Sequence, residues 1–284
     1  MNRTVLIRDF AMTSTFLLGG ELSVCRLGFG AMRLCAQPGN FGRYPDWEAG
    51  KRLLRRAVEL GINFIDTAHA YGPGWNEELI GEALAPYPAG VVIATKGGIE
   101  KTAPDKIFPD ARPENLRRRC EESLRRLRTE RIDLYQLHRP DPNVPLADSV
   151  GALAELRRAG KVRHIGLSNV TLAQLDEARA ITPIASVQNR YNLAERGDDP
   201  LIDACASHGI AYLPWGPLAA KPFAREAPLA GIPALAWLLK RAPNIIPIPG
   251  TTSPAHLEEN VAAARVTLTD EEFTRLANEF SPGA

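Results

Sequence analysis

Short apolar runs and stretches of helical periodicity alternate along the whole chain. Eight runs of strand length occur, at residues 27–29, 62–65, 91–94, 132–137, 162–167, 184–187, 210–213 and 245–248. Between them apolar residues recur at helical spacing, as in Leu116, Cys120, Leu124 and Leu127. This alternation predicts an α/β fold with a parallel sheet, either open and doubly wound or closed. Eight units, with polar residues at nearly every strand end, favour the closed (β/α)8 TIM barrel.

Two additions to the barrel are expected near the ends of the chain. The apolar segments 15–18 and 22–25 flank Gly19-Gly20, which predicts an N-terminal β-hairpin that closes the barrel bottom. Thr269, with Glu272 three residues later, predicts the start of one extra C-terminal helix. Because 284 residues is a usual length for one closed barrel, residues 1–284 are expected to form a single domain.

Charge and composition argue against several classes of partner. The formal net charge is +1, so no strong field favours nucleic acid or an anionic membrane. The first residues, from Met1, lack a signal-peptide core, and no apolar run reaches the ~20 residues that span a bilayer. The four cysteines lie far apart without ligand spacing, so no metal site is expected. We therefore expect a cytoplasmic protein, and a monomer because the barrel buries its own core.

Polar residues close three of the predicted strands. Asp66 follows the run 62–65, Lys96 follows 91–94 after one residue, and His138 follows 132–137. In a parallel barrel these side chains emerge at one rim, and Tyr71 lies in the loop after Asp66. A buried Lys96 requires an acid, which Asp66 supplies. The paired ammonium is expected to lower the pKa of Tyr71 toward the range of a general acid.

Together these residues suit the protonation of a carbonyl oxygen, with His138 as a hydrogen-bond partner of that oxygen. No side chain supplies hydride, so a nicotinamide cofactor is required. An isomerase or aldolase in which Lys96 forms a Schiff base is the alternative left open by the residues alone. His69, which lies in the same loop, is assigned no role.

Several segments of the chain, in order, resemble the aldo-keto reductase family. They are GINFIDTAHAYG at 61–72 with Glu77 and Gly81 after it, ATK at 94–96, SLRRL at 123–127 and IDLYQLH at 132–138. The resemblance runs from Leu27 to about Asn260. It implies an NADPH-dependent oxidoreductase that reduces aldehydes or ketones to alcohols. It also implies that Tyr71 is the proton donor, tuned by Lys96 and Asp66, while His138 orients the substrate carbonyl.

The resemblance further implies where the cofactor is held. Ser168, Asn169 and Gln188 match the residues that hold the nicotinamide carboxamide. An aromatic ring stacks on the nicotinamide in this family, and either Tyr212 or Trp215 fills that role here. Other cofactor contacts are implied at Gly30, Ala31, Met32, Arg33, Pro214, Gly216, Leu218, Ile248, Gly250, Thr251, Thr252, Ser253, His256, Glu259 and Asn260.

The adenosine end corresponds to a loop that leads into a helix at Ser253, and a helix N-terminus favours phosphate. Family members often carry Lys or Arg there for the 2′-phosphate, whereas this chain has Gly250, Thr252 and His256. We expect NADP, with NAD as the alternative cofactor. The expected substrate is a small carbonyl compound in an apolar pocket formed by Met32, Trp75, Phe108 and Trp215.

Two further expectations concern the whole protein. The chain ends at Ala284, soon after the helix opened by Thr269, so an open substrate pocket is expected. Some relatives, the potassium-channel β subunits, hold cofactor while serving an assembly. A cofactor-holding regulatory subunit with little turnover is therefore the alternative to an enzyme.

Overall fold

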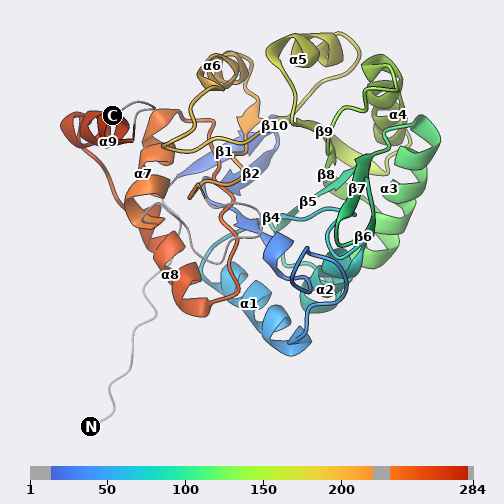
Figure 1. The fold of residues 1–284 in the computed structure, drawn as a ribbon, viewed down its shortest axis with the longest axis horizontal. Helices are drawn as coiled ribbons and strands as arrows, with labels where there is room; N and C mark the ends of the chain where they lie inside the picture. Colours follow the sequence, from blue (N-terminus) through green and yellow to red (C-terminus); the bar gives the residue numbers. More distant parts are fainter. Residues whose placement is uncertain (1–13, 220–230, 281–284) are drawn as a thin grey trace.

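The computed structural model of the chain describes residues 14–219 and 231–280 (Figure 1). The stretch from Met1 that bears on a signal peptide lies outside the described residues, as does the end of the chain at Ala284. Among the described residues, no helix has the length and apolar character needed to cross a membrane.

A parallel sheet lies at the centre, curled inside a ring of helices (Figure 1). Its strand order is β11-β10-β9-β8-β5-β4-β3, and every neighbouring pair is parallel. The strands are β3 (Phe29–Gly30), β4 (Phe64–Asp66), β5 (Val92–Gly97), β8 (Ile132–Leu137), β9 (Val162–Ser168), β10 (Ser186–Gln188) and β11 (Ala211–Tyr212). Parallel neighbours with a helix in each connection confirm the predicted (β/α)8 architecture.

The eighth predicted run closes the barrel without forming a regular strand. On one side, the Ile246 amide donates to the Tyr212 carbonyl oxygen at 2.9 Å, and Ile245 forms an isolated parallel bridge with Tyr212. On the other side, the Gly28 amide donates to the Pro247 carbonyl oxygen at 2.9 Å. Proline has no N–H, so this segment cannot make a full ladder of hydrogen bonds. The prediction placed this run correctly but overestimated its regularity.

The N-terminal hairpin forms as predicted from β1 (Thr15–Leu18) and β2 (Leu22–Cys25). Both turn glycines have positive φ. A Cβ on Gly19 would lie 2.2 Å from the His164 ring, so only glycine fits there. Leu18 and Val24 belong to the same apolar cluster as inward residues of the parallel strands. The hairpin therefore covers the N-terminal end of the barrel.

Nine helices are found in the described residues, and eight of them pack around the sheet (Figure 1). The nine helices are α1 (Trp47–Glu59), α2 (Trp75–Leu84), α3 (Pro113–Leu127), α4 (Leu146–Arg158), α5 (Leu172–Arg179), α6 (Asp199–Ser207), α7 (Gly231–Arg241), α8 (Pro254–Ala263) and the extra α9 (Asp270–Glu279). The capping box at the start of α9 is present, as predicted from Thr269, and a second capping box, formed by Thr171 and Gln174, begins α5.

A second hairpin was not predicted. It consists of β6 (Ile99–Ala103) and β7 (Lys106–Pro109), which pair antiparallel directly after β5. A short 3-10 helix, η1 (Ala31–Arg33), follows β3. The β6–β7 sequence is short, charged and contains Pro104, so its apolar alternation is weak. This hairpin builds one wall of the site described next.

Candidate active site

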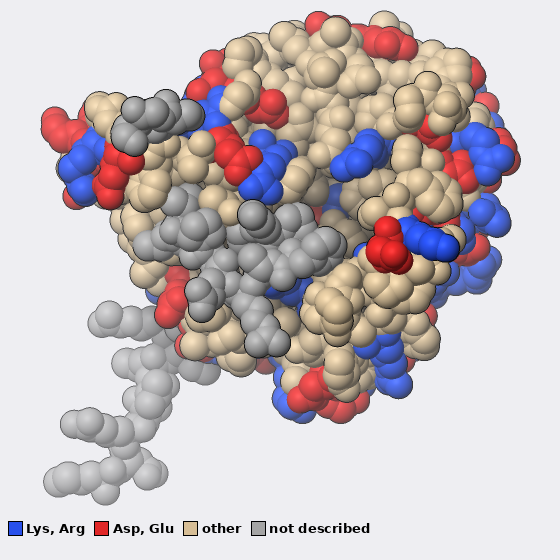
Figure 2. Space-filling view, viewed as in Figure 1, with Lys and Arg blue, Asp and Glu red and all other residues tan. Residues whose placement is uncertain are grey.

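A cavity of about 900 Å³ opens where the parallel strands end. β4 ends at Asp66, β9 at Ser168 and β10 at Gln188, while His138 directly follows β8. All four side chains line the cavity. On the face of the molecule seen in Figure 2, side chains of both charges are interspersed. The strand ends therefore converge as the sequence analysis predicted from parallel strands.

A buried ion pair lies beneath the cavity. The Lys96 ammonium contacts Asp66 Oδ1 at 2.6 Å and the Tyr71 hydroxyl at 3.4 Å. The other carboxylate oxygen, Oδ2, accepts from Gln188 at 2.9 Å and from Gln136 at 3.3 Å. Lys96 is completely buried, and the carboxylate supplies the opposite charge that makes its burial possible.

The electrostatics of Tyr71 differ from the sequence expectation. Burial raises the pKa of its phenol, and the Lys96 ammonium opposes that rise only in part. The expectation of a lowered pKa was wrong, because loss of hydration outweighs the nearby positive charge. Burial also lowers the pKa of Lys96, but the Asp66 carboxylate raises it above its ordinary value. At neutral pH Tyr71 is therefore protonated beside a charged lysine.

His138 faces Tyr71 across the cavity. The two rings meet edge to face, with centroids 5.8 Å apart and planes at 84°. Burial, followed by the positive charge of Lys96, holds the pKa of His138 well below its usual value. Its Nδ1 atom is buried and has no hydrogen-bond partner among the described residues. The imidazole is therefore neutral, with hydrogen-bonding capacity still unused.

Next to His138, polar side chains form a connected hydrogen-bond network. Asn169 donates from Nδ2 to the His138 carbonyl oxygen and to Ser168 Oγ, each at 3.0 Å. The Ser168 hydroxyl donates to the Gln188 carbonyl oxygen at 2.7 Å. The Trp215 indole N–H donates to Asn169 Oδ1 at 3.3 Å. These contacts fix the side chains in place along the cavity wall.

The two aromatic candidates for stacking lie in different places. Tyr212 is completely buried, and its hydroxyl donates to Asp198 Oδ2 at 2.7 Å. Its ring packs edge to face on Tyr191 in the core. Trp215 instead lines the cavity, and the Arg190 guanidinium lies 5.2 Å from its ring centre. Of these two rings, only that of Trp215 borders the cavity.

The far end of the cavity lies at the start of α8, where Ser253 is the N-cap. The Ser253 amide donates to Thr251 Oγ1 at 3.0 Å, which shapes the loop. A Cβ on Gly30 would lie 2.5 Å from the Ile248 carbonyl oxygen, and one on Gly250 would lie 2.7 Å from the Gly30 carbonyl oxygen. Glycine at both positions lets two backbones meet here, and both glycines border the cavity beside a helix N-terminus.

Most predicted cofactor residues border this one cavity. They are Gly30, Met32, Arg33, Ser168, Asn169, Gln188, Trp215, Gly216, Leu218, Ile248, Gly250, Thr251, Thr252, Ser253, His256, Glu259 and Asn260. Three others, Ala31, Tyr212 and Pro214, lie outside its lining as far as the chain is described. Of the predicted substrate pocket, Met32 and Trp215 line the cavity, whereas Trp75 and Phe108 are exposed elsewhere by 44% and 46%.

Several lining residues were missed by the sequence analysis. They include Asn40, Ala70, Ile99, Lys101, Ile107 and Arg139. Ile99, Lys101 and Ile107 come from the unpredicted β6–β7 hairpin, and the Lys101 ammonium donates to the Gly39 carbonyl oxygen. The sequence signal was the alternation of Ile99 and Lys101 just after the strand that carries Lys96, which places both on one face.

A model of the Aldo/keto reductase family matches residues 26–229 and 228–278. The chain is 42% identical over 280 residues to the pyridoxine 4-dehydrogenase of Escherichia coli, covering 93% of this chain and 97% of that protein. A glycerol dehydrogenase structure from Gluconobacter oxydans superposes with TM-score 0.83 at 30% identity, covering 93% and 94% of the two chains. An aldo/keto reductase from Klebsiella pneumoniae, solved with NADP and acetate, gives TM-score 0.78 at 28% identity, covering 95% and 97%.

Proposed function

Because the chain belongs to the aldo/keto reductase family and is an NAD(P)H-dependent oxidoreductase, we propose that it uses NADPH to reduce an aldehyde carbonyl to an alcohol. The observation that carries this proposal is the contact of the Tyr71 hydroxyl with the Lys96 ammonium at 3.4 Å. That contact places a protonated phenol beside a fixed positive charge, in a cavity that also contains a neutral imidazole.

In the proposed reaction Tyr71 gives its proton to the carbonyl oxygen. The Lys96 ammonium stabilises the phenolate that remains, and Asp66 offsets the charge of the lysine when the phenol is intact. His138, being neutral, offers a hydrogen bond to the same oxygen and orients the carbonyl. The bound cofactor supplies the hydride. A Schiff-base mechanism is disfavoured, because the raised pKa of Lys96 keeps its amine protonated.

The cofactor is proposed to lie along the cavity from Tyr71 to the start of α8. Ser168, Asn169 and Gln188 border its inner end and suit a carboxamide, which both donates and accepts hydrogen bonds. Trp215 is proposed as the ring that stacks on the nicotinamide. At the outer end, the backbone amides at the α8 N-terminus suit the phosphates. The fit rests on the unpartnered His138 Nδ1 and on the Gly30 and Gly250 backbones, which approach closely and both border the cavity.

NADPH is proposed ahead of NADH on two grounds. The Klebsiella pneumoniae relative was solved with NADP. In this chain Thr252, Ser253 and His256 border the cavity at the α8 N-terminus, and Arg33 borders it as well. These groups offer hydroxyl, amide and cationic donors for a 2′-phosphate in place of the lysine or arginine that is often found in the α8 loop.

The substrate is proposed to be an aldehyde carried on an aromatic ring. The pyridoxine 4-dehydrogenase relative is named for the oxidation of pyridoxine, a ring alcohol whose oxidation product is an aldehyde on the same aromatic ring. In this chain Trp215, Ile99 and Ile107 border the cavity and offer apolar surface for a flat ring. A cytoplasmic location, a monomeric state and the single domain over residues 1–284 remain predictions.

The experiment is to replace Tyr71 with Phe, which removes the proton donor but keeps the ring. We expect kcat for NADPH-dependent reduction of pyridoxal to fall by a factor of about 10² to 10⁴, since that is the usual contribution of a positioned acid. NADPH binding, followed by tryptophan fluorescence, should stay within twofold of wild type. A Tyr71→Phe variant with unchanged kcat would contradict the role of Tyr71.

A further inference from the structure

His69 lies in the loop between β4 and α2, three residues after Asp66 and two before Tyr71. Its side chain is only 3% exposed and lies outside the described lining of the cavity. The proposed reaction therefore makes no direct use of it. A buried histidine in the loop that carries the proton donor calls for a physical explanation.

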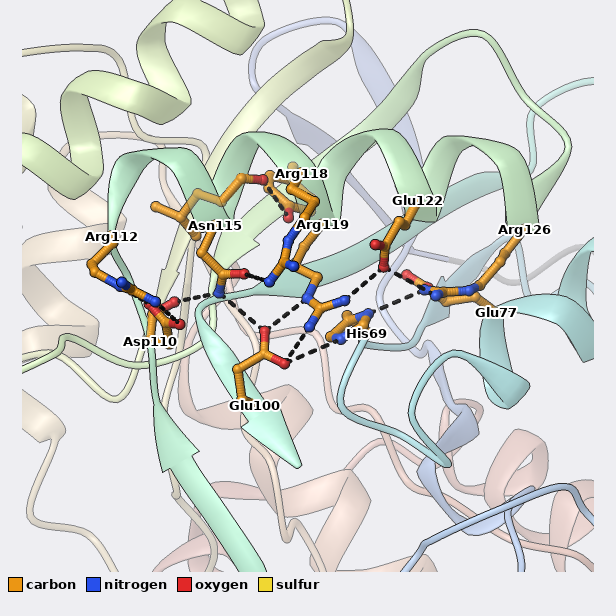
Figure 3. Close-up of polar contacts among 12 residues, drawn as sticks. His69, Glu77, Glu100, Asp110, Arg112, Asn115, Arg118, Arg119, Glu122 and Arg126 are labelled. Atoms are coloured by element: carbon orange, nitrogen blue, oxygen red, sulfur yellow. Dashed lines mark hydrogen bonds and ion pairs between the residues drawn. The ribbon is translucent and has the colours of Figure 1, made fainter. Parts of the chain in front are cut away.

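The two ring nitrogens of His69 face groups of opposite charge (Figure 3). Nδ1 lies 3.1 Å from Nη1 of Arg126, and Nε2 lies 3.8 Å from Oε2 of Glu100. A guanidinium can only donate hydrogen bonds, so Nδ1 must be the acceptor. The proton of the neutral ring then resides on Nε2, directed at the carboxylate. The surroundings thus select one tautomer and one ring orientation.

Arg126 of α3, which contacts His69 Nδ1, is itself held by two carboxylates. The Arg126 guanidinium also binds Glu77 at 3.2 Å and Glu122 at 3.1 Å (Figure 3). Glu77 is completely buried and accepts a 2.6 Å hydrogen bond from Thr95, the residue before Lys96. The arginine is therefore tied to the strand that supplies the catalytic lysine.

On the hairpin side, Glu100 is held equally firmly. Arg119 of α3 binds both of its carboxylate oxygens, at 2.7 and 2.5 Å, and Asn115 donates to it at 3.0 Å. Burial alone raises the pKa of Glu100, but the His69 contact and the hydrogen bonds from Arg119 bring it well below the usual range. Glu100 thus stays ionised, and it lies on β6 between two residues that line the cavity.

The His69 ring consequently joins two parts of the site that the backbone does not join directly. The backbone amide of His69 donates to the Lys96 carbonyl oxygen at 3.1 Å, and this bond connects the loop to β5. The His69 side chain contacts the β6–β7 hairpin through Glu100 and α3 through Arg126. The loop that presents Tyr71 is thereby fixed relative to the wall that contacts substrate.

We propose that His69 is a positioning residue, whose contacts with Arg126 and Glu100 hold the Tyr71 loop in register with the β6–β7 hairpin. The proposal rests on the proposed function, because its consequence is the placement of the proton donor. Displacement of a reacting group by about 1 Å can lower a rate a hundredfold. Loss of the His69 contacts should therefore act on turnover more than on cofactor binding.

The test compares three variants. His69→Leu keeps the volume but removes both polar contacts, whereas His69→Asn keeps an oxygen near the position of Nδ1 to accept from Arg126. The matched control is His164→Leu, because His164 is also a buried histidine paired with a glutamate, Glu21, at 2.9 Å. That pair lies beside the N-terminal hairpin, at the opposite end of the barrel.

We expect His69→Leu to lower kcat for the aldehyde about ten- to a hundredfold, with the NADPH dissociation constant within twofold of wild type. His69→Asn should recover most of the lost kcat. His164→Leu should lower the thermal midpoint yet leave kcat unchanged. Equal losses of kcat in the two leucine variants, or no loss in His69→Leu, would refute a positioning role.

Hydrogen–deuterium exchange of residues 66–74 provides a readout that does not depend on turnover. Exchange in this loop should become faster in His69→Leu and stay unchanged in His164→Leu. Unchanged exchange in His69→Leu would overturn the inference even if wild type reduced no aldehyde. Absence of wild-type reductase activity would instead count against the proposed function.

Discussion

At the scale of single residues, the site is governed by competition between burial and charge. Burial raises the pKa of Tyr71 and would lower that of Lys96, and the Asp66 carboxylate reverses the second effect but not the first. The outcome is a protonated phenol touching a charged amine. Both states suit proton donation, because the acid retains its proton at neutral pH and its conjugate base is stabilised once formed.

The depressed pKa of His138 predicts an acid-sensitive component of stability. The unfolded chain takes up a proton near pH 6.5, whereas the folded site does not until well below that value. Stability from this group is thus present above about pH 6.5 and is lost as pH falls below it. Between pH 6.5 and 5.5 the loss should be about 1 kcal/mol in the free energy of unfolding.

Urea unfolding of wild type and His138→Gln across this pH range measures that component. The variant should show a smaller decrease than wild type, because glutamine does not titrate. Groups with a lowered carboxyl pKa, such as Glu100, act at lower pH and do not interfere. Parallel decreases in the two proteins would show that His138 is not the source.

At the scale of elements, the barrel is closed by an irregular segment rather than by a strand. Pro247 cannot donate a hydrogen bond, so the seam relies on amides supplied by the neighbouring residues. The Gly30 and Gly250 backbones approach closely at this seam, where the Gly30 amide donates to the Pro249 carbonyl oxygen at 3.2 Å. Both glycines border the cavity proposed to hold the cofactor.

Gly30→Ala should therefore damage both the seam and the binding of NADPH. Its Cβ would lie 2.5 Å from the Ile248 carbonyl oxygen, a backbone atom that cannot rotate away. We expect a loss of about 1–3 kcal/mol in the free energy of unfolding, together with weaker NADPH binding. Thermal denaturation and fluorescence titration measure the two effects.

Gly151→Ala in α4 is the matched control, because a Cβ there would meet no described atom within 4 Å. It should leave binding unchanged and stabilise the helix by about 0.5–1 kcal/mol. A Gly30→Ala protein as stable as wild type would mean that the seam relaxes at little cost.

At the scale of the whole molecule, one cavity connects elements from both halves of the chain. It is bordered by η1, the β6–β7 hairpin, the ends of β9 and β10, and the start of α8. A ligand that spans it should bind the folded state alone. Ligation should therefore stabilise the entire barrel against unfolding.

NADPH at a hundredfold excess over its dissociation constant should add about 2.7 kcal/mol to the free energy of unfolding. The thermal midpoint should rise, and it should rise more than with NADH at the same concentration. Tyr71→Phe should show the same shift as wild type, since its change affects proton transfer alone. No shift with either nucleotide would contradict the cavity as a dinucleotide site.

Local sequence patterns predicted much of the secondary structure and the topology of the sheet. The alternation of runs predicted the parallel barrel, and Gly19-Gly20 predicted the N-terminal hairpin. Strand ends at Asp66 and Ser168 follow from the same pattern, because parallel strands bring their carboxyl ends to one rim. Asp66, Lys96 and His138 could be named from the sequence for this reason, whereas the cofactor residues were named from the family resemblance and the residues of the β6–β7 hairpin were missed.

The tertiary structure alone decided the charge states and contact partners of several site residues, because these depend on residues distant in sequence. The net pKa direction of Tyr71 depends on burial, which no local motif specifies. Tyr212 and Trp215 are three residues apart, yet Tyr212 lies in the core, where its hydroxyl donates to Asp198, while Trp215 borders the cavity. His69 acquires its partners from α3 and β6, more than 30 residues away in sequence. Sequence periodicity fixes which face a residue occupies, whereas its charge state and partners are set by elements that only folding brings together.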